Sequence, residues 1–383
     1  MAFLANRSVN MLNLHYGLHA LAMSGGGVFY AVYLLKAGVS VPLVLTAFAA
    51  IFGGRFLIRP LILVLARRWG LKPVVIAGTL VQAVQYLILA HVHGLDVYLL
   101  ALCLVSALGD TLYWTTYHAY FAALGDAEHR GQQVSAREAL AAGVGIVAPV
   151  LGGWALVSLG AGVAFGLVAL IQALAALPLL GGPDVRVADQ APGMLKASRM
   201  GFVLFLAEGW MGAGWVFVWQ IVLFLNLNQS LTAFGGAMAL AAIAGALGGL
   251  VLGRVVDAGH GGRAAALAFT VLAATIVLRT LASHPVLALA ANALGSLVGC
   301  LYVPPLMTAV YNLAKASPCA LRFHMVTEGA FDLGCGVCCL LTACLIHLGV
   351  PISQTLLLAL LGATGTLLLL RRYYAETPMA ETV

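Results

Sequence analysis

Two arginines and an aspartate interrupt segments of the chain that are otherwise apolar. Arg55 and Arg59 lie one helical turn apart in the segment 41–66, and Asp110 lies in the segment 96–124. A charge inside a lipid bilayer is costly unless it is paired or hydrated, so each of these side chains is a candidate for function. At about 1.5 Å of rise per residue, Arg55 and Asp110 fall at matching depth, which predicts an ion pair.

The sequence leaves two interpretations of this pair open. The contact either contributes to a binding site or only fixes two helices against each other. In both cases Arg59 has no obvious carboxylate in the same half of the chain. A guanidinium group that faces a cavity is well suited to bind a carboxylate, phosphate or sulfate group. We therefore predict that Arg55 or Arg59 binds an anionic group of a small molecule.

Carboxylates dominate the second half of the chain. Glu208 lies in one apolar segment, and Glu328 and Asp332 lie one helical turn apart in another. A lone carboxylate in an apolar cavity favours its protonated form and can therefore take up and release protons. Asp332 is the first expected proton carrier and Glu208 the second, with Asp110 as a further member of this set. Glu328 lies nearer the cytoplasmic end of its helix, where it either joins them, caps the helix or pairs with a loop arginine.

A metal site is an alternative interpretation of some of these positions. Metal-ligating side chains recur along one stripe of the segment 324–348 and near the N-terminus, namely His15, His19, His324, Cys335 and Cys339. Residues three apart on one helix do not close a metal site alone, so a partner helix would have to supply ligands. We expect no cofactor and no bound metal, and keep transport of a transition metal or metalloid as an alternative.

The segments that carry these residues have the composition of membrane helices. Hydrophobic residues make up 62% of the chain and charged residues 8%, whereas roughly a quarter of the residues in soluble domains are charged. A membrane-spanning helix needs about 20 apolar residues. The pattern predicts an all-α integral membrane protein with twelve such helices, at 12–35, 41–66, 73–93, 96–124, 134–159, 161–182, 200–226, 231–255, 264–283, 285–314, 324–348 and 352–371.

The sequence repeats itself at half its length. Three pairs of segments about 190 residues apart resemble each other, namely LYWTTYHAYFAAL (112–124) and LYVPPLMTAVYNL (301–313), REALAAGVG (137–145) and EGAFDLGCG (328–336), and VLARRWGLK (64–72) and VVDAGHGGR (255–263). Repeats of this kind are typical of transporters with two related halves. We predict two pseudo-symmetric six-helix halves, 1–182 and 200–383, joined by a cytoplasmic linker at 183–199.

Basic residues indicate the orientation in the membrane. The net charge is +6, and nearly all Lys and Arg lie on one side of the predicted helices, with only Lys36 and Arg279 on the other. Cytoplasmic loops are enriched in these residues, so the charge reflects topology and predicts no nucleic-acid partner. The protein is expected in a bacterial-type inner (plasma) membrane, with both termini on the cytoplasmic side. The N-terminus shows no small-residue cleavage site and is expected to be a short tail.

The loops after the second and eighth helices resemble a motif of the major facilitator superfamily of secondary transporters, and the resemblance covers essentially the whole chain. In that family these loops carry Gly-x-x-x-Asp followed by Gly and basic residues. The matching positions here form a cytoplasmic gate motif of Arg67, Arg68, Gly70, Lys72, Gly253, Asp257 and Arg263. Arg67 stands where the family has Asp, so the resemblance implies a latch between the halves through Asp257 alone.

A second motif resembles that of antiporters in the same family. The family pattern is Gly-x-x-x-Gly-Pro-x-x-Gly-Gly, and the fifth helix carries Gly145, Pro149, Gly152 and Gly153, with Ala148 in place of one glycine. Small residues let helices approach closely, and proline bends a helix. Glycine-rich faces occur in membrane bundles of many kinds, so the motif favours an antiporter and leaves a purely structural role open.

The resemblance also implies which residues surround a substrate. In the family the first, fourth, seventh and tenth helices line a central cavity, which would place six aromatic side chains near the substrate, namely His19, Trp114, His118, Trp215, Trp219 and Tyr302. Anchoring at the membrane surface is the alternative role of tryptophan. This alternative fits Trp219 better than the deeper Trp114.

The implied function is proton-coupled secondary active transport of a small organic solute, anionic or amphipathic, by alternating access. Efflux by antiport is favoured. The alternatives are import of an organic acid by proton symport, transport of a metal, and a non-transporting sensor or assembly partner. The sequence contains no phosphate-binding loop and no nucleophile elbow, so we expect neither an ATP-driven pump nor an enzyme. The protein is expected to act as a monomer in the lipid bilayer.

Overall fold

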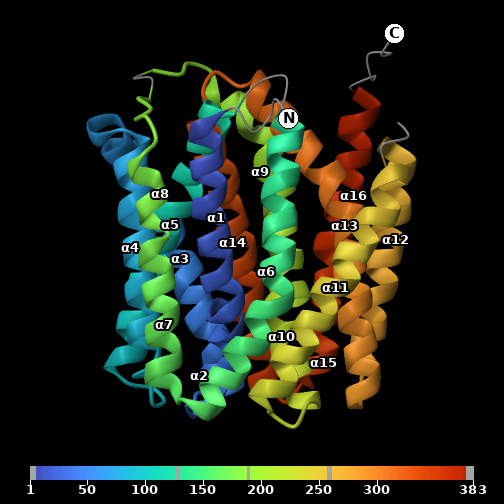
Figure 1. Ribbon diagram of the computed structural model, residues 1–383. Helices are drawn as coiled ribbons and strands as arrows, with labels where there is room; N and C mark the ends of the chain where they lie inside the picture. Colours follow the sequence, from blue (N-terminus) through green and yellow to red (C-terminus); the bar gives the residue numbers. More distant parts are fainter. Residues whose placement is uncertain (1–5, 126–129, 188–189, 257–260, 377–383) are drawn as a thin grey trace.

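The computed structural model describes residues 6–125, 130–187, 190–256 and 261–376 (Figure 1). Within these ranges the chain consists of helices joined by short connections. The first half contains α1 (Arg7–Gly25), α2 (Tyr30–Lys36), α3 (Val41–Trp69), α4 (Leu71–Leu89), α5 (Val97–Leu124), α6 (Arg130–Ser158), α7 (Ala161–Leu174) and α8 (Ala176–Leu180).

The second half has the same number of helical spans. It contains α9 (Met194–Gly212), α10 (Trp219–Asn226), α11 (Leu231–Val256), α12 (Gly261–Thr280), α13 (Pro285–Ala316), α14 (Ala320–His347), α15 (Ile352–Thr355) and α16 (Ala359–Glu376). A π-helical turn, η3 (Ala213–Val218), joins α9 to α10. The 3-10 turns η2 (Gly27–Phe29) and η4 (Leu356–Leu358) interrupt the first and last spans.

Eleven helical spans of the described chain are long and apolar enough to cross a membrane, and α12 contributes a twelfth, shorter apolar stretch, Ala266–Thr280. The predicted twelve-helix, all-α architecture is thus confirmed. The largest differences from the predicted boundaries are at the starts of α1 and α9 and at the end of α16. Polar and charged residues lie in the terminal turns at all three ends, and Asn6 caps α1 by accepting the backbone N–H of Val9, so hydropathy alone does not mark these ends.

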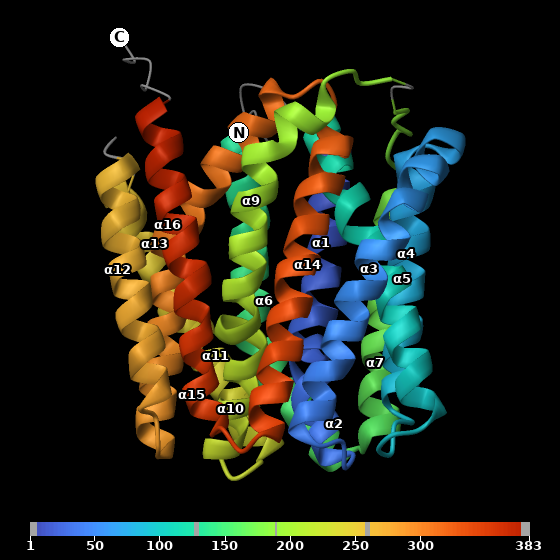
Figure 2. The same ribbon diagram turned by 180° about the vertical axis from the view of Figure 1, so that it is seen from behind.

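The helices run side by side along one direction, and α1 begins at the same end of the bundle at which α16 ends (Figures 1 and 2). We call this the terminal end and the opposite one the distal end. The predicted repeats fall on the fourth and fifth spans of each half, α5 and α13 for one pair and α6 and α14 for another. The orientation in the membrane stays a prediction.

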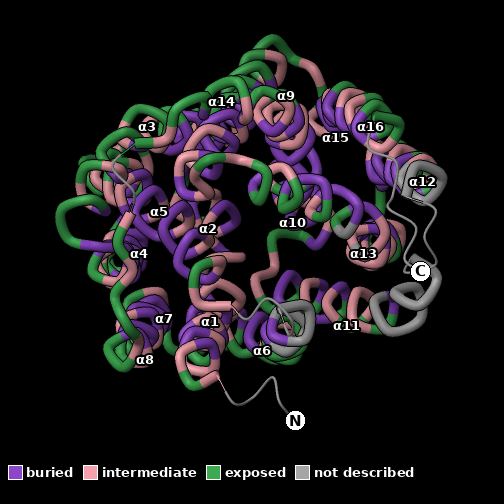
Figure 3. The backbone as a smooth tube through the Cα atoms, turned by 90° about the horizontal axis from the view of Figure 1, so that it is seen from above, coloured by how far each residue is buried: buried purple, intermediate pink, exposed green. Residues whose placement is uncertain are grey.

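The outer surface of the bundle is strongly apolar. Leu57 on α3 is 77% exposed and Leu104 on α5 is 70% exposed. Viewed along the helices, many exposed residues lie on outward faces and buried residues lie between helices (Figure 3). Soluble proteins rarely expose contiguous apolar patches of more than a few hundred Å². Lipid is therefore the medium that this surface fits.

Two pairs of helices make the main contacts between the halves. α3 packs against α14, and α6 packs against α11; both pairs lie side by side in the end view (Figure 3). Glycines bring α6 close to its neighbours. A Cβ atom at Gly153 would lie 2.7 Å from the carbonyl oxygen of Leu231 at the start of α11, and one at Gly235 of α11 would collide with the carbonyl oxygen of Pro149.

The glycines of the antiporter-like motif also hold α6 against α1. A Cβ atom at Gly152 would collide with the carbonyl oxygen of Gly25 and lie 2.9 Å from the ring of Phe29. At Gly145 the contact is looser, because a Cβ atom there would lie 3.6 Å from Ala242. The predicted close approach is confirmed for Gly152 and Gly153, and it gives these two residues a packing role whatever the direction of transport.

Replacing Gly152 by a larger residue should therefore destabilise the protein. Gly152→Leu forces α1 and α6 apart, and overpacking of this kind costs about 1–3 kcal/mol. Gly143→Leu is the matched control on the same helix, because a Cβ atom there meets nothing within 4 Å. Thermal unfolding of the two purified variants in detergent measures the difference. Equal melting temperatures would contradict the packing role.

Candidate functional site

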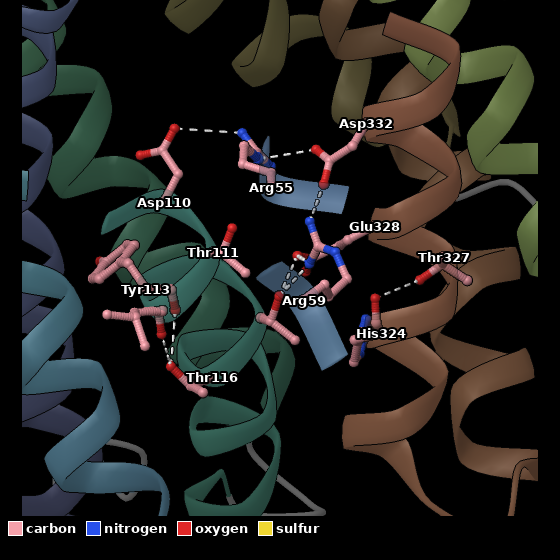
Figure 4. A network of polar contacts seen from close by, with 12 residues as sticks. Arg55, Arg59, Asp110, Thr111, Tyr113, Thr116, His324, Thr327, Glu328 and Asp332 are labelled. Atoms are coloured by element: carbon pink, nitrogen blue, oxygen red, sulfur yellow. Dashed lines mark hydrogen bonds and ion pairs between the residues drawn. The ribbon is translucent and has the colours of Figure 1, made fainter. Parts of the chain in front are cut away.

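Arg55 lies on α3, whose contact face packs against α14 of the other half (Figure 4). Its Nε atom lies 2.9 Å from Oδ1 of Asp332 on α14. Its Nη1 atom lies 3.4 Å from Oδ2 of Asp110 on α5. The predicted contact between Arg55 and Asp110 is confirmed, but it is the longer of the two. Arg55 thereby links carboxylates that belong to different halves.

Arg59, one turn further along α3, also has carboxylate partners. Its Nη1 atom lies 2.9 Å from Oε2 of Glu328, and its Nη2 atom contacts Oδ2 of Asp332. Nη1 also donates to the hydroxyl of Thr115, which itself donates to Oε2 of Glu328 over 2.9 Å. The expectations of an unpaired Arg59 and of a lone Asp332 are wrong. Both expectations came from considering each half separately, whereas these side chains meet between the halves.

These ionised groups form a buried network with unequal charges. The two guanidinium groups of Arg55 and Arg59 face three carboxylates. Side-chain exposure ranges from 0% for Asp332 to 22% for Asp110. With all five groups ionised, the network carries one negative charge in excess. Oε1 of Glu328 has no hydrogen-bond partner within the described chain, so it is an oxygen on which a proton can neutralise that charge.

A stack of rings flanks the network toward the terminal end. His118 on α5 and His324 on α14 face each other with ring centroids 5.9 Å apart. Trp114, one turn before His118, stacks on it at 5.8 Å. His118 is therefore placed beside the network and against the second half. The ring contact and the ion pairs of Arg55 together connect α5 to α14.

A cavity of about 540 Å³ lies between the halves, on the distal side of the network. Of the predicted binding residues, Arg55 and Trp114 contribute to its wall, together with Asp110 of the proton-coupling set. Gly145 and Pro149 of α6 also line it. Most of the remaining wall is apolar or aromatic, including Tyr30, Phe48, Phe52, Tyr86 and Phe217.

A chain of hydrogen bonds runs from Asp110 into the core of the first half. Nε2 of Gln82 donates to Oδ1 of Asp110 over 2.8 Å, and Nε2 of Gln172 donates to Oε1 of Gln82 over 3.0 Å. Oε1 of Gln172 lies 3.1 Å from Nδ1 of His19. Nε2 of Gln172 also lies 3.1 Å from Nδ1 of His19, so the tautomer of His19 decides which of the two groups donates. His19 is 1% exposed and belongs to this chain of hydrogen bonds rather than to the cavity wall.

Three predicted binding residues lie within the second half and away from the cavity wall. Trp215 and Tyr302 contact each other with ring centroids 6.4 Å apart. Nε1 of Trp219 donates to Oδ1 of Asn292 over 3.0 Å, and Trp219 is 2% exposed, so surface anchoring does not describe it. The prediction rested on which helices line the cavity in the family; here Trp215 lies within the π-helical turn η3, which changes the helical register before Trp219.

Arg279 of α12 fills the space beside this π-helical turn. Its guanidinium carbon lies 3.8 Å from the ring centroid of Trp215 and 4.6 Å from that of Trp219. Its Nη1 atom donates to the carbonyl oxygen of Trp215 over 2.8 Å. Arg279 is 4% exposed, so it belongs to the core of the second half rather than to a membrane surface. Aromatic faces and a carbonyl oxygen thus compensate this buried charge.

Glu208 on α9 stands apart from the ion pairs described above. Its Oε2 atom is buried and has no hydrogen-bond partner among the described residues. The neighbouring Gly209 lies against the backbone of Phe331 on α14. Glu208 itself interacts electrostatically with Tyr302 on α13, and its part in proton coupling stays a prediction.

The residues proposed as metal ligands are dispersed. The described part of the chain contains no group of three His, Cys, Asp or Glu side chains that could hold a metal ion. His15 has structural partners, since its Nδ1 atom lies 2.7 Å from the carbonyl oxygen of Ala175 and its Nε2 atom 3.0 Å from the hydroxyl of Tyr113. Cys335 and Cys339 are fully buried in the packing of α14.

The first gate motif contacts the linker that follows α8. Gly70 ends α3 with φ at +88°, and a Cβ atom there would collide with the carboxylate of Asp184. Asp184 accepts the backbone N–H of Lys72 over 3.2 Å, and Nζ of Lys72 donates to the carbonyl oxygen of Gly182 over 2.9 Å. Asp184 thus supplies a carboxylate to the loop in which Arg67 replaces the expected acid.

The remaining gate residues are described only in part. Arg68 accepts a hydrogen bond at its carbonyl oxygen from Arg186 over 3.1 Å. Asp257 lies outside the described residues, as does the side chain of Arg263 on α12, while Gly253 belongs to α11. The latch that the resemblance implied through Asp257 stays a prediction.

Three neutral residues of the site were not singled out from the sequence. Thr115 joins the network, and Gln82 and Gln172 form the chain behind Asp110. Each is a polar side chain in an apolar helix. Such a residue marks a candidate site in the same way as a charged residue does, but less strongly, because a neutral group costs less to bury in lipid. The sequence analysis considered ionisable and aromatic residues and therefore missed them.

Comparisons with known proteins agree with this architecture. A sequence profile of the Major Facilitator Superfamily matches residues 12–320. No curated protein matches significantly. Among solved structures, a POT family transporter in complex with 5-aminolevulinic acid is similar with a TM-score of 0.74 and 10% identity, over 97% of this chain and 96% of that one.

Two further solved structures are similar over nearly their full length. The human organic anion transporter MFSD10 (TETRAN) has a TM-score of 0.68 and 16% identity, over 96% of this chain and 98% of that one. A mutant of the nucleoside transporter NupG has a TM-score of 0.64 and 13% identity, over 97% and 99%. At these identities the likeness shows a common fold and says nothing about the substrate.

The two partners Arg59 and Glu328 should be energetically coupled. Arg59→Met leaves two carboxylates without that cation, and removing one partner of a buried pair costs about 3–5 kcal/mol. Glu328→Gln should cost less, because it removes the excess negative charge. The double variant should therefore lose less stability than the sum of the single variants. Thermal unfolding of all four proteins gives the coupling energy; additive losses would contradict the ion pair.

Proposed function

Because the chain belongs to the major facilitator superfamily, we propose that it is a proton-coupled secondary active transporter that moves a small amphipathic organic solute by alternating access. It is a membrane transporter of small molecules and not an enzyme. Efflux by antiport is the favoured direction, since α6 carries the antiporter-like motif at its contacts with α1 and α11. The basic residues of the terminal end support an inner (plasma) membrane location with both termini in the cytoplasm.

The observation that carries the proposal is the charge network between α3 and α14. Arg59 contacts Glu328 and Asp332, so these ion pairs join the two halves. A movement that separates α3 from α14 must break them. Protonation of Glu328 removes a negative charge that holds Arg59 and thus weakens the contact between the halves. Proton uptake would in this way shift the balance between the two conformations.

The geometry favours an amphipathic solute over a simple anion. The arginines expected to bind an anion already contact carboxylates, and Arg55 and Arg59 share Asp332. An anion would have to displace that carboxylate in a network that already has an excess of negative charge. The aromatic cavity wall provides contacts for the apolar part of a solute. Import of an organic acid and metal transport therefore receive less support from the site.

Glu328→Gln should separate solute exchange from proton movement. Glutamine has the shape of the protonated carboxyl group but cannot release a proton. Proteoliposomes that contain a pH-sensitive dye would be tested with organic solutes that raise the melting temperature of the protein. We expect solute-dependent proton movement with wild type, and continued solute exchange without proton movement with Glu328→Gln.

The matched control is Glu376→Gln, whose side chain is 59% exposed at the end of α16. It should behave like wild type in both measurements. Proton movement that persists in Glu328→Gln would overturn the role of Glu328. A complete loss of exchange in a folded Glu328→Gln protein would show that the residue is needed for the conformational change and not for coupling.

A further inference from the structure

We propose that the solute carries a positively charged nitrogen, as a protonated amine or a quaternary ammonium group, and that Asp110 binds it. This inference rests on the proposed transport function and adds the chemical class of the substrate. Asp110 lies in the cavity wall and is 22% exposed, the largest exposure in the network. It is therefore the carboxylate that a solute in the cavity reaches first.

The two oxygens of Asp110 have different surroundings. Oδ1 accepts a hydrogen bond from Gln82 over 2.8 Å, and Gln82 is itself held by Gln172. The amide groups of this chain all donate toward the carboxylate, and Gln82 and Gln172 are buried. These hydrogen bonds hold the Asp110 carboxylate in one orientation from the side away from the cavity. A fixed carboxylate binds a cation without first losing conformational freedom.

Oδ2 of Asp110 retains capacity for a ligand. Its contact is Nη1 of Arg55 at 3.4 Å, which is long for a charge-assisted hydrogen bond. Arg55 lies closer to Asp332, with Nε and Oδ1 2.9 Å apart. A carboxylate oxygen accepts about two hydrogen bonds, so an ammonium group can bind Oδ2 while Arg55 keeps its contact with Asp332.

The aromatic wall of the cavity favours the same sign of charge. The faces of aromatic rings are negative and attract cations within about 6 Å of the ring centroid. Tyr30, Phe48, Tyr86, Trp114 and Phe217 all line the cavity. The ring of Phe52 already shows this behaviour, because the guanidinium carbon of Arg55 lies 5.2 Å from its centroid. An anion in this cavity would face Asp110 and several ring faces.

The charge balance relates this site to proton coupling. The ionisable groups around Asp110 are Arg55 on α3, Tyr30 on α2 and Tyr86 on α4, with Asp332 and Glu328 on α14 beyond Arg55. A cationic solute at Asp110 neutralises the one excess negative charge, as does a proton on Glu328. Because either positive charge neutralises the network, a bound solute lowers the affinity of Glu328 for a proton, and a bound proton lowers the affinity of Asp110 for the solute. Such competition is what exchange across a membrane requires.

Three probes of similar size and different charge test the proposal, namely benzylamine as its protonated cation, benzyl alcohol and phenylacetate. Their affinities are measured by thermal shift and by tryptophan fluorescence of purified protein in detergent, since Trp114 lies in the cavity wall. We expect the cation to raise the melting temperature and the other two probes to have no effect. A larger shift with phenylacetate than with the cation, or a shift with neither ion, would overturn the proposal.

Variants of two acidic residues on the same helix locate the site. Asp110→Asn should weaken cation binding by about tenfold or more, because it removes the charge of a charge-assisted contact. Asp110→Glu keeps the charge and should keep the preference for the cation. Asp96→Asn is the matched control, since Asp96 caps α5 by accepting the N–H of Leu99 and asparagine caps equally well. Equal cation affinity in wild type and in folded Asp110→Asn would overturn the site.

The test of cation binding at Asp110 and the test of proton coupling at Glu328 can fail independently of each other. The binding measurement needs neither a membrane nor a proton gradient. Cation binding that depends on Asp110, without solute-dependent proton movement in proteoliposomes, would overturn the coupling and leave the site. Proton movement driven by a solute that binds equally well to Asp110→Asn would overturn the site and leave the coupling.

Discussion

A charged side chain in a membrane bundle needs an opposite charge or a polar group within reach, and here that requirement joins the two halves. Arg55 and Arg59 belong to the first half, while Glu328 and Asp332 belong to the second. Neither set is stable alone in an apolar medium. The network is therefore both a structural contact and a place where a change of charge alters how the halves hold together.

Helix packing decides that these charges meet. α3 lies against α14 and α6 lies against α11, and the α6 contacts depend on glycines that let backbones touch. Gly153 and Gly235 bring α6 and α11 together near the distal end, whereas the ion pairs join α3 and α14 deeper in the bundle. Small residues in one interface and paired charges in the other are two ways to hold helices together without a hydrophobic driving force.

The two halves compensate their buried polar groups differently. In the first half, Asp110 continues into a chain of amides that ends at His19. In the second half, Arg279 is held by the ring faces of Trp215 and Trp219 and by a carbonyl oxygen of the π-helical turn. The halves thus share the order of their helices and differ in their interiors. The charged side chains in the wall of the cavity, Arg55 and Asp110, both belong to the first half.

Composition and hydropathy determined the class of protein, the twelve spans and most helix boundaries, because a helix in lipid must be apolar over a fixed length. The depth of Arg55 and Asp110 along their helices was enough to predict their contact, since both belong to one half. The tertiary structure alone decided that Arg59 meets Glu328 and Asp332, because packing between distant helices leaves no periodic signal in a single sequence. It also decided that Trp215 and Trp219 face Arg279, because the identity of a cavity-lining helix does not say which of its faces is turned toward the cavity, and the π-helical turn changes that face along the helix.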